Sequence, residues 1–445
     1  MNQAPPSGKL ARGAIAAVAL GQAGLARAGH QVRALTRSNQ AQAEARVELD
    51  ADLGRILFRA MNQLKGTALK LSQMLSSYAD FLPPALRREL GAACYSVTPL
   101  NRALVHKVFR QEFGCAPEQL FASFDGQAFA AASLGQVHRA TLADGMPVAV
   151  KVQYPGIASS IGSDLQMLRA MVRALGVRTE RMPPPEVVDQ VMDEIAFKLA
   201  EELDYVHEAA QLNWFREHAA LPGIVIPQPI LRHSSRRVLT MERLSGLHLD
   251  QWLATEPGQA ARNHAGQLLF DWYLHSTFEL GRLHADPHAG NFLFMDDGRL
   301  GLIDFGCTRT LTPGFSARLA ATWNGLLAFA PGSSSEPVRL AYVALGYIDA
   351  SLSQADFDAD LVPAITPSTQ WMVAPFRTAS FDFGATAPFP LLDSENARTL
   401  RRNMCGMPPD APYADRAYLG MVQMLKQLGA TVSTKNRWIS PSGGV

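Results

Sequence analysis

Three side chains in the second half of the chain have the types and spacing that phosphoryl transfer requires. Asp286 and Asn291 lie five residues apart behind a helical pattern, and Asp304 comes thirteen residues later, behind a short apolar strand pattern. Amide and carboxylate oxygens are hard donors that suit Mg²⁺, whereas a further carboxylate can orient or deprotonate an attacking hydroxyl or water. We therefore expect Asn291 and Asp304 to hold the metal and Asp286 to act on the nucleophile.

A cation for the non-transferred phosphates is supplied by Lys151, near the end of a short β-branched strand. Such a lysine is paired with a helical carboxylate, and the long helix predicted over 186–218 offers three candidates, Glu202, Asp204 and Glu208. Asp204 and Glu208 are four residues apart and share a helix face, whereas Glu202 points away from both. Two like charges so close together indicate a nearby cation; a solvated acidic face is the alternative.

The order of these elements matches the protein-kinase signature set. The loop 284–291 has the His-x-Asp-x₄-Asn spacing, and the Asp-Phe-Gly tripeptide at 304–306 follows a strand. The tripeptide alone is weak evidence, because it recurs at 382–384. Its spacing from the loop, together with Lys151, carries the prediction.

The segment that should cover the phosphates departs from the kinase pattern. Kinases place glycines there so that backbone N–H groups approach phosphate. The loop predicted over 128–140 carries alanines instead, which restrict the backbone and favour helix, so we expect it to be stiffer and to hold phosphates differently. Its candidate nucleotide-binding residues, besides Lys151, are Ala130, Ala131, Ala132, Ser133 and Gln136.

A second departure follows the Asp-Phe-Gly tripeptide. A peptide-phosphorylating kinase has a long activation loop that ends in Ala-Pro-Glu. Here residues 307–318 lead quickly into an apolar helix predicted over 319–329, without that motif. Because the usual peptide platform is not evident, we expect Asp286 to act on ATP with water or a small acceptor.

Together these motifs resemble the UbiB/AarF atypical kinases over about residues 50–330, and the coenzyme-Q-biosynthesis subgroup among them. The resemblance is carried by the alanine loop 130–138, the Lys151 strand with Gln153-Tyr154-Pro155-Gly156-Ile157 behind it, Glu202-Leu203-Asp204-Tyr205, and 284–291. It extends back to 65–73, where Lys-Leu-Ser-Gln resembles the family's Lys-x-Gly-Gln signature.

The resemblance assigns a regulatory cleft motif to the N-terminal part. Lys70 and Gln73 enter the cleft, where Lys70 meets Glu202 and Asp204. Ser72 replaces the motif's glycine and adds a side chain where close approach is required, so we expect Ser72→Gly to change nucleotide affinity without unfolding the chain. Read from the residues alone, Lys70 and Gln73 are the polar edge of an amphipathic helix.

The resemblance also implies a fold and an activity. The fold is α+β, a bilobal protein-kinase-like fold with an N-terminal helical extension and a largely helical C-terminal lobe. The implied activity is Mg²⁺-dependent binding of ATP (or ADP) and ATP hydrolysis that supports ubiquinone biosynthesis at a membrane, with little or no phosphorylation of proteins. Lys151 then contacts phosphates and pairs with Glu208.

Changes in pattern divide the chain into four parts. An Ala/Arg-rich N-terminal extension (1–50) precedes a helical extension with the Lys-x-Ser-Gln motif (51–120), a kinase-like N-lobe (121–245) and a kinase-like C-lobe (246–445). Within them we expect a helix over 101–113 stopped by Gly114, a hairpin turn at Asp144-Gly145, strands over 225–229, 238–242 and 300–303, and a helix over 259–283.

The composition limits the partners and the compartment. Apolar residues make up 47% and charged residues 18%, enough for a sizeable core, and the net charge of +1 gives no case for a nucleic-acid partner. Four widely spaced cysteines indicate a reducing compartment. No segment reaches the roughly 20 apolar residues of a membrane span.

The Ala-rich stretch 13–26 bears on localisation, because it has the apolar character but not the cleavage site of a secretory signal. It is either a packing helix or a helix on a membrane surface. We expect a protein that is cytoplasmic or peripheral on the cytoplasmic face of the inner membrane. Its expected partners are a nucleotide and, beyond that, a membrane surface, quinone precursors or quinone-biosynthesis proteins.

Two other functions remain open at this point. The His-x-Asp-x-His-x-Gly-Asn loop also resembles aminoglycoside-type small-molecule phosphotransferases, which lack the Lys70 and alanine-loop elements. A nucleotide-binding scaffold without chemistry is the other alternative, although such a scaffold would not need Lys151, Glu208, Asp286 and both metal ligands together.

Overall fold

The computed structural model describes residues 9–34, 101–132, 134–176, 185–330, 332–390 and 394–440, with short stretches between 48 and 60. Lys70, Ser72, Gln73 and Ser133 lie outside the described residues, so the expectations about them stay predictions. The chain forms two compact units, Met1–Ala209 with Pro229–Arg243, and Ala210–Gln228 with Leu244–Val445. Each unit is described by itself.

The first unit is built on an antiparallel sheet in the order β1-β3-β4-β6, with β2 added on β3. The strands are β1 (Ser123–Phe124), β2 (Ala130–Ala132), β3 (Gly135–Thr141), β4 (Pro147–Gln153) and β6 (Val238–Glu242). The predicted turn joins β3 to β4, and Gly145 supplies the left-handed backbone there with φ of +88°. The predicted strand over 238–242 is confirmed as β6.

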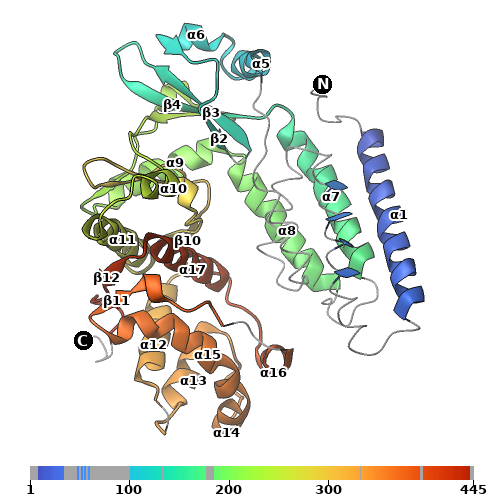
Figure 1. Ribbon diagram of the computed structural model, residues 1–445, viewed down its shortest axis with the longest axis vertical. Coiled ribbons are helices and arrows are strands. Elements are labelled where there is room, and N and C mark those ends of the chain that lie inside the picture. Colours follow the sequence, from blue (N-terminus) through green and yellow to red (C-terminus); the bar gives the residue numbers. More distant parts are fainter. Residues whose placement is uncertain are drawn as a thin grey trace. The chain divides into compact units, whose positions relative to one another are not determined.

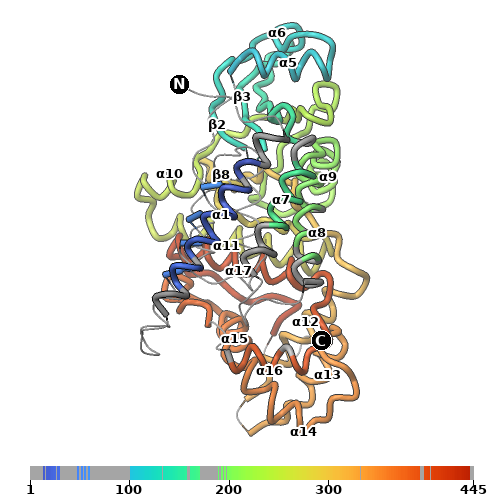
Figure 2. The backbone as a smooth tube through the Cα atoms, turned by 90° about the vertical axis from the view of Figure 1, so that its right-hand side faces the viewer, coloured from blue at the N-terminus to red at the C-terminus, as the bar shows by residue number. Residues whose placement is uncertain are grey.

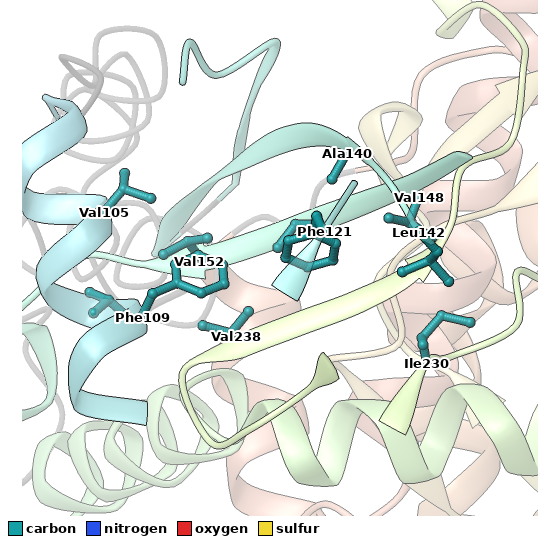
Figure 3. Packing of buried hydrophobic residues seen from close by; sticks show 11 residues of the cluster. Val105, Phe109, Phe121, Ala140, Leu142, Val148, Val152, Ile230 and Val238 are labelled. Carbon is teal, nitrogen blue, oxygen red and sulfur yellow. The ribbon is translucent and has the colours of Figure 1, made fainter. Parts of the chain in front are cut away.

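Helix α5 (Arg102–Phe113) covers one face of this sheet. Asn101 accepts a hydrogen bond from Leu104 N at its start and Gly114 ends it in the left-handed conformation, so the predicted helix and its stop are confirmed. Phe109 from α5 packs with Phe121 and with the alternate β4 residues that face it (Figure 3). The core members on β4 are Val148, Val150 and Val152, all fully buried.

Three further helices of the first unit lie side by side in the ribbon and tube views (Figures 1 and 2). They are α1 (Lys9–Ala34), α7 (Ile157–Gly176) and α8 (Pro185–Glu202), with α7 in contact with both of the others. The N-terminal helix expected from the Ala/Arg-rich sequence is therefore present as α1. Among the residues that the structure describes, no helix has the length and apolar character to cross a membrane.

The helix predicted as continuous over 186–218 is two helices, α8 and α9 (Tyr205–His218). The break lies at Leu203 and Asp204, because Asp204 Oδ1 accepts hydrogen bonds from the N–H groups of Val206 and His207, each at 3.1 Å. A carboxylate in that role caps a new helix. The prediction missed this signal, and the boundary between the two units falls in α9 after Ala209.

The second unit is mainly helical, as predicted, with small sheets. Its strands are β5 (Ile224–Val225), β7 (Arg282–His284), β8 (Phe292–Phe294), β9 (Leu300–Leu302), β10 (Thr308–Thr310), β11 (Ser380–Asp382) and β12 (Thr431–Ser433). Its helices include α10 (Leu249–Leu253), α11 (Gln259–Leu274), α12 (Phe315–Ala328), α13 (Glu336–Leu345), α15 (Val362–Val373), α16 (Ser394–Asn403) and α17 (Ala411–Leu428).

Two predicted elements of this unit are shorter than expected. The helix predicted over 259–283 ends as α11 at Leu274 and continues only as a π-helical turn, His275–Glu279, before β7 begins at Arg282. Gly281, with φ of +59°, makes the turn into that strand. The strand predicted over 225–229 is the two-residue β5, which pairs in parallel with β9.

Candidate active site

Lys151 and Glu208 form a buried ion pair in the first unit. Lys151 Nζ lies 2.8 Å from Glu208 Oε1 and 2.9 Å from Oε2, and the two side chains are 8% and 1% exposed. The Lys151 ammonium also lies 5.0 Å from the centre of the Tyr205 ring. The predicted pairing is therefore present, and it fixes the lysine on β4 against helix α9.

The start of α9 is held beside β4 by a second polar contact. Gln153 Nε2 donates a hydrogen bond of 2.6 Å to the carbonyl oxygen of Leu203, in the break before α9. Gln153 is 1% exposed, and a buried amide that lost this acceptor would cost stability. Gln153 therefore ties the strand of Lys151 to the helix of Glu208, two residues beyond the lysine.

The register of the sheet separates the candidate nucleotide-binding residues into two sets. Val137 lies opposite Lys151 and Ala130 lies opposite Val137, so these residues share one face. Gln136 lies opposite the core residue Val152 and so belongs to the other face. Ala132 goes with the first set and Ala131 with the second, because side chains alternate along a strand.

Gln136 contacts the interior of the first unit. Its amide nitrogen lies 2.8 Å from His138 Nε2, while His138 Nδ1 lies 2.8 Å from the carbonyl oxygen of Asp125. Both side chains are almost fully buried, and burial lowers the pKa of His138. The structure thus does not bring the Gln136 side chain together with Lys151.

The alanine segment is extended rather than helical or loop-like. Ala130–Ala132 form β2 and pair with the first residues of β3, so the loop predicted over 128–140 consists largely of two paired strands, and pairing in the sheet overrides the helix propensity of alanine. Gly135 follows the turn, and a Cβ atom there would lie 2.3 Å from the carbonyl oxygen of Val152. The one glycine in this hairpin is required by close packing against β4.

The catalytic-loop candidates of the second unit stand on a backbone frame of two antiparallel pairs. β7, which ends at His284, pairs with β10, and β8, which begins at Phe292, pairs with β9. Ala285 N donates to the carbonyl oxygen of Cys307 at 3.0 Å, and Ile303 N donates to that of Asn291 at 3.1 Å. The loop 284–291 and the tripeptide 304–306 are therefore held side by side by main-chain hydrogen bonds.

Asp286 is held by two side-chain donors. Asn291 Nδ2 donates to the Asp286 carbonyl oxygen at 2.8 Å and lies 3.2 Å from Asp286 Oδ2. Arg416 Nη2, from α17, lies 2.5 Å from Asp286 Oδ1. Each carboxylate oxygen thus has a donor of its own, and one of these donors is charged.

Asp304 and Phe305 are placed by His284. His284 Nε2 lies 2.8 Å from the Asp304 carbonyl oxygen and is therefore the protonated ring nitrogen. Asp304 Oδ1 accepts from Gly306 N at 2.9 Å. Phe305 is fully buried, with ring centres 5.4 Å from His284 and 5.1 Å from Phe215.

The donor set fits a magnesium ion. The side-chain amide nitrogen of Asn291 donates to Asp286, so the side-chain oxygen of Asn291 remains available as a metal ligand. Asp304 contributes a carboxylate from the neighbouring segment. Mg²⁺ is commonly bound by one or two protein oxygens, with waters and phosphates completing its shell. Among the described residues no cluster of three or more His, Cys, Asp or Glu side chains is placed to bind a metal ion.

The segment after the tripeptide is short and anchored. Residues 307–314 join Gly306 to α12 and include β10, so this described stretch contains no long activation loop. Arg309 Nε donates to Asp410 Oδ1 at 2.8 Å and Thr312 N donates to Asp410 Oδ2 at 2.7 Å. Burial raises the pKa of Asp410, but the hydrogen bonds from Thr312 and Arg309 outweigh it and lower that pKa overall.

The remaining candidates are not gathered into one site by the described residues. Asp204 is the cap of α9, and Glu202 lies in the last turn of α8, so the two do not share a helix with Glu208 as predicted. Lys70 and Gln73, their predicted neighbours, lie outside the described residues. Reasoning from the sequence quoted Gln153 as part of a motif but gave its side chain no role, and it missed Arg416, which stands in no pattern that marks its partner.

Comparison with known families gives one match over more than half of the chain. Residues 94–330 match the family model of the ABC1 atypical kinase-like domain. Among curated proteins, the chain is 26% identical over 419 residues to "Atypical kinase COQ8, mitochondrial" of Saccharomyces cerevisiae, covering 92% of this chain and 80% of that protein. It is 33% identical over 252 residues to "Protein ACTIVITY OF BC1 COMPLEX KINASE 3, chloroplastic" of Arabidopsis thaliana, covering 56% and 35%.

A solved structure extends the likeness to the fold. The structure of Rv3197 with erythromycin from Mycobacterium tuberculosis has a TM-score of 0.60 and 25% identity, covering 90% of this chain and 99% of that one. The predicted kinase-like α+β fold is thereby confirmed. The chain spans about half or less of the length of several curated relatives that it matches.

Proposed function

This chain belongs to the ABC1 atypical kinase-like family, and on that premise we propose that it binds Mg²⁺-ATP and transfers the terminal phosphoryl group to water or to a small acceptor. The observation that carries the proposal is the buried pair of Lys151 and Glu208. Burying two charges is costly and often contributes less stability than an apolar pair of similar volume. Such a pair is best explained by a need to hold an ammonium group in place for phosphate.

The roles of the other residues follow from their positions. Lys151 binds the non-transferred phosphates, and Ala130, Ala132 and Val137 share its face of the hairpin. Asn291 and Asp304 hold the Mg²⁺, which neutralises the phosphate oxygens when bound.

Asp286 orients the attacking hydroxyl or water. Its carboxylate is already fixed by Asn291 and Arg416, so it is a better orienting group than a strong base. The short anchored segment 307–314 offers no surface comparable to a peptide platform. This supports water or a small molecule, rather than a protein, as the acceptor.

The chemistry is tested by Mg²⁺-dependent release of ADP and phosphate from ATP by the purified protein. Asp304→Asn should abolish turnover while leaving the melting temperature within a few degrees of the wild type. Asp382→Asn is the matched control, because Asp382 heads the same tripeptide and accepts from Gly384 N at the same 2.9 Å. Nucleotide binding without any turnover in the wild type would favour a scaffold; equal turnover in the Asp304 variant would remove Asp304 from the site.

The pathway proposed for this activity is ubiquinone biosynthesis, with the protein in the cytoplasm or peripheral on the cytoplasmic face of the inner membrane. It is supported by the coenzyme-Q-subgroup motifs and by similarity to the yeast atypical kinase COQ8. Quinone precursors or quinone-biosynthesis proteins are the partners proposed with it. Deleting the gene should lower ubiquinone and accumulate its precursors, and complementation with Asp304→Asn should not restore it. Normal quinone levels in the deletion strain would refute the pathway but not the ATP chemistry.

A small-molecule phosphotransferase is the second candidate. It is favoured by the likeness to a protein solved with erythromycin and by the short segment behind the Asp-Phe-Gly tripeptide. Release of ADP should then rise when erythromycin or a related hydroxylated compound is added, and a phosphorylated product should appear. Hydrolysis that no added hydroxyl compound accelerates would exclude this candidate in favour of the ATPase.

A further inference from the structure

Helix α17 meets the catalytic loop although it lies far beyond it in sequence. The family match ends at residue 330, whereas α17 spans Ala411–Leu428. The helix contacts β7, the strand that leads into the loop. Figure 1 labels α17 and also β10, the strand that pairs with β7. All of these elements belong to the second unit.

One contact is the ion pair of Arg416 with Asp286. The atoms Nη2 and Oδ1 lie 2.5 Å apart, and the side chains are 36% and 29% exposed. A hydrogen bond between two charged groups is stronger than one between neutral groups. At this exposure solvent partly screens the pair, so its contribution to stability is small but measurable, and its main consequence is the orientation of the carboxylate.

A second contact lies one helical turn further on, at Gly420. A Cβ atom built there would be 2.5 Å from Pro287 Cγ and 3.1 Å from the Pro287 carbonyl oxygen. Residues four apart share a helix face, so Arg416 and Gly420 meet two consecutive residues of the loop. Ala417 and Met421, beside them on α17, line a small cavity together with His284 and Pro287.

A third contact fixes the start of α17. Asp410 directly precedes the helix, is fully buried, and accepts hydrogen bonds from Arg309 and from Thr312 N in the segment behind the Asp-Phe-Gly tripeptide. Helix α17 is therefore held both to the catalytic loop 284–291 and to the segment that follows the Asp-Phe-Gly tripeptide. These two attachments together fix the position of the helix relative to Asp286.

We propose that Arg416 is a positioning residue for Asp286: α17 carries its guanidinium to the catalytic loop, where it fixes the carboxylate in the orientation that directs the acceptor. The inference rests on the proposed phosphoryl transfer at Asp286. With Oδ1 on Arg416 and Oδ2 near Asn291, the plane of the carboxylate is determined by one residue inside the family-matched domain and one outside it.

The consequence for catalysis is a split between turnover and nucleotide binding. Arg416 contacts the group that orients the acceptor, whereas the phosphates are assigned to Lys151 and the metal ligands. Arg416→Gln keeps much of the aliphatic side chain but replaces the charged guanidinium, with its several N–H donors, by one neutral amide group. We expect kcat for ATP hydrolysis to fall on the order of tenfold to a hundredfold, the scale of a misplaced reacting group, with KM for Mg²⁺-ATP within about twofold of the wild type.

Two further variants separate positioning from general structure. Arg416→Lys retains the positive charge and should recover part of the lost kcat. Arg299→Gln is the matched control: Arg299 is also an ion-paired arginine of the second unit, 2.7 Å from Asp297 on the turn between β8 and β9. It should leave kcat and KM unchanged. Wild-type kcat in Arg416→Gln, or equal loss in Arg416→Gln and Arg299→Gln, would overturn the proposal.

A measurement that needs no turnover distinguishes this inference from the proposed function. Melting temperatures of Arg416→Gln, Asp286→Asn and the double variant form a double-mutant cycle. Paired side chains should give non-additive shifts, with the second substitution costing less once the first is present. Additive shifts would refute the pairing, even if the wild type hydrolyses ATP. Conversely, a wild-type protein without turnover would refute the proposed function, and the double-mutant cycle of melting temperatures would still test whether Arg416 and Asp286 are paired.

Discussion

Removing Glu208 should destabilise the first unit strongly, because it takes away the carboxylate that pairs with the buried Lys151 ammonium. Lys151 is 8% exposed at its side chain and Glu208 1%, so little solvent reaches either group. Truncating one member of such a pair costs about 3–5 kcal/mol, since the remaining charge keeps its desolvation penalty. The Tyr205 ring, 5.0 Å from the ammonium, compensates only in part.

The expected shift follows from the size of the unit. For a unit of roughly 150–250 residues, 1 kcal/mol corresponds to about 2–4 °C in melting temperature, so Glu208→Ala should lower it by about 6–20 °C. The apolar double variant Lys151→Met/Glu208→Leu should recover most of this loss, because buried ion pairs can be replaced by packed apolar side chains at little cost. Stability and function should then separate: the double variant folds but does not bind nucleotide.

Two assays check these statements. Calorimetric melting without nucleotide measures the stability of the wild type, the single variant and the double variant. Titration calorimetry with Mg²⁺-ADP measures affinity at a temperature where all three are folded. A loss of less than about 1 kcal/mol in Glu208→Ala would show that the pair is screened as surface pairs are. Wild-type affinity in the double variant would show that Lys151 does not bind phosphate.

Three other substitutions have defined outcomes. Gly135→Ala puts a Cβ atom 2.3 Å from the Val152 carbonyl oxygen, so overpacking should lower stability by about 1–3 kcal/mol in denaturant melts; an unchanged midpoint would show that the hairpin is loose. Gly420→Ala puts a Cβ atom 2.5 Å from Pro287 Cγ and should lower kcat at least tenfold with a smaller effect on stability, and wild-type kcat would contradict the contact. Burial raises the pKa of Asp415 to about 7 in the folded protein, whereas the same group has a pKa near 3.9 in the unfolded chain. The unfolded chain therefore loses this proton first, and the free energy of unfolding falls as pH rises from about 4 through 7. Asp415→Asn should therefore raise stability at pH 8 by about 1–3 kcal/mol, less than the full shift because the residue is only partly buried, and change it little at pH 4; the same gain at both values would exclude titration of Asp415.

Features set by local chemistry were predictable from the sequence. Helix α5 has its cap at Asn101 and its stop at Gly114 because both signals lie within one turn of the helix ends. The pairing of Lys151 with Glu208, 57 residues apart, is not local: the residues alone left Glu202, Asp204 and Glu208 as candidates, and the choice of Glu208 came from the family resemblance.

Features set by competition between signals were not predictable in the same way. Asp204 reads equally well as a charge on a helix face or as the cap of a new helix, and only its acceptance of two N–H groups decides for the cap. The alanines of β2 favour helix by propensity, yet pairing with β3 makes them extended. Arg416 is 130 residues from Asp286, and helical periodicity tells which residues share a face but not what that face meets.

The repeated Asp-Phe-Gly shows what makes the first copy a site. Asp304 and Asp382 each accept from the glycine N–H two residues on at 2.9 Å, and both phenylalanines are fully buried, so the two tripeptides share these local contacts. Asp304, however, follows β9 of the β8–β9 hairpin, Asn291 directly precedes β8, and the Asp304 carbonyl oxygen accepts a hydrogen bond from His284 Nε2. Asp382 instead ends β11, whose partner is β12, with no loop of oxygen donors beside it among the described residues. The tripeptide therefore specifies only the hydrogen bond between its aspartate and its glycine, and the pairing of the neighbouring strands makes one of the two copies a candidate metal site.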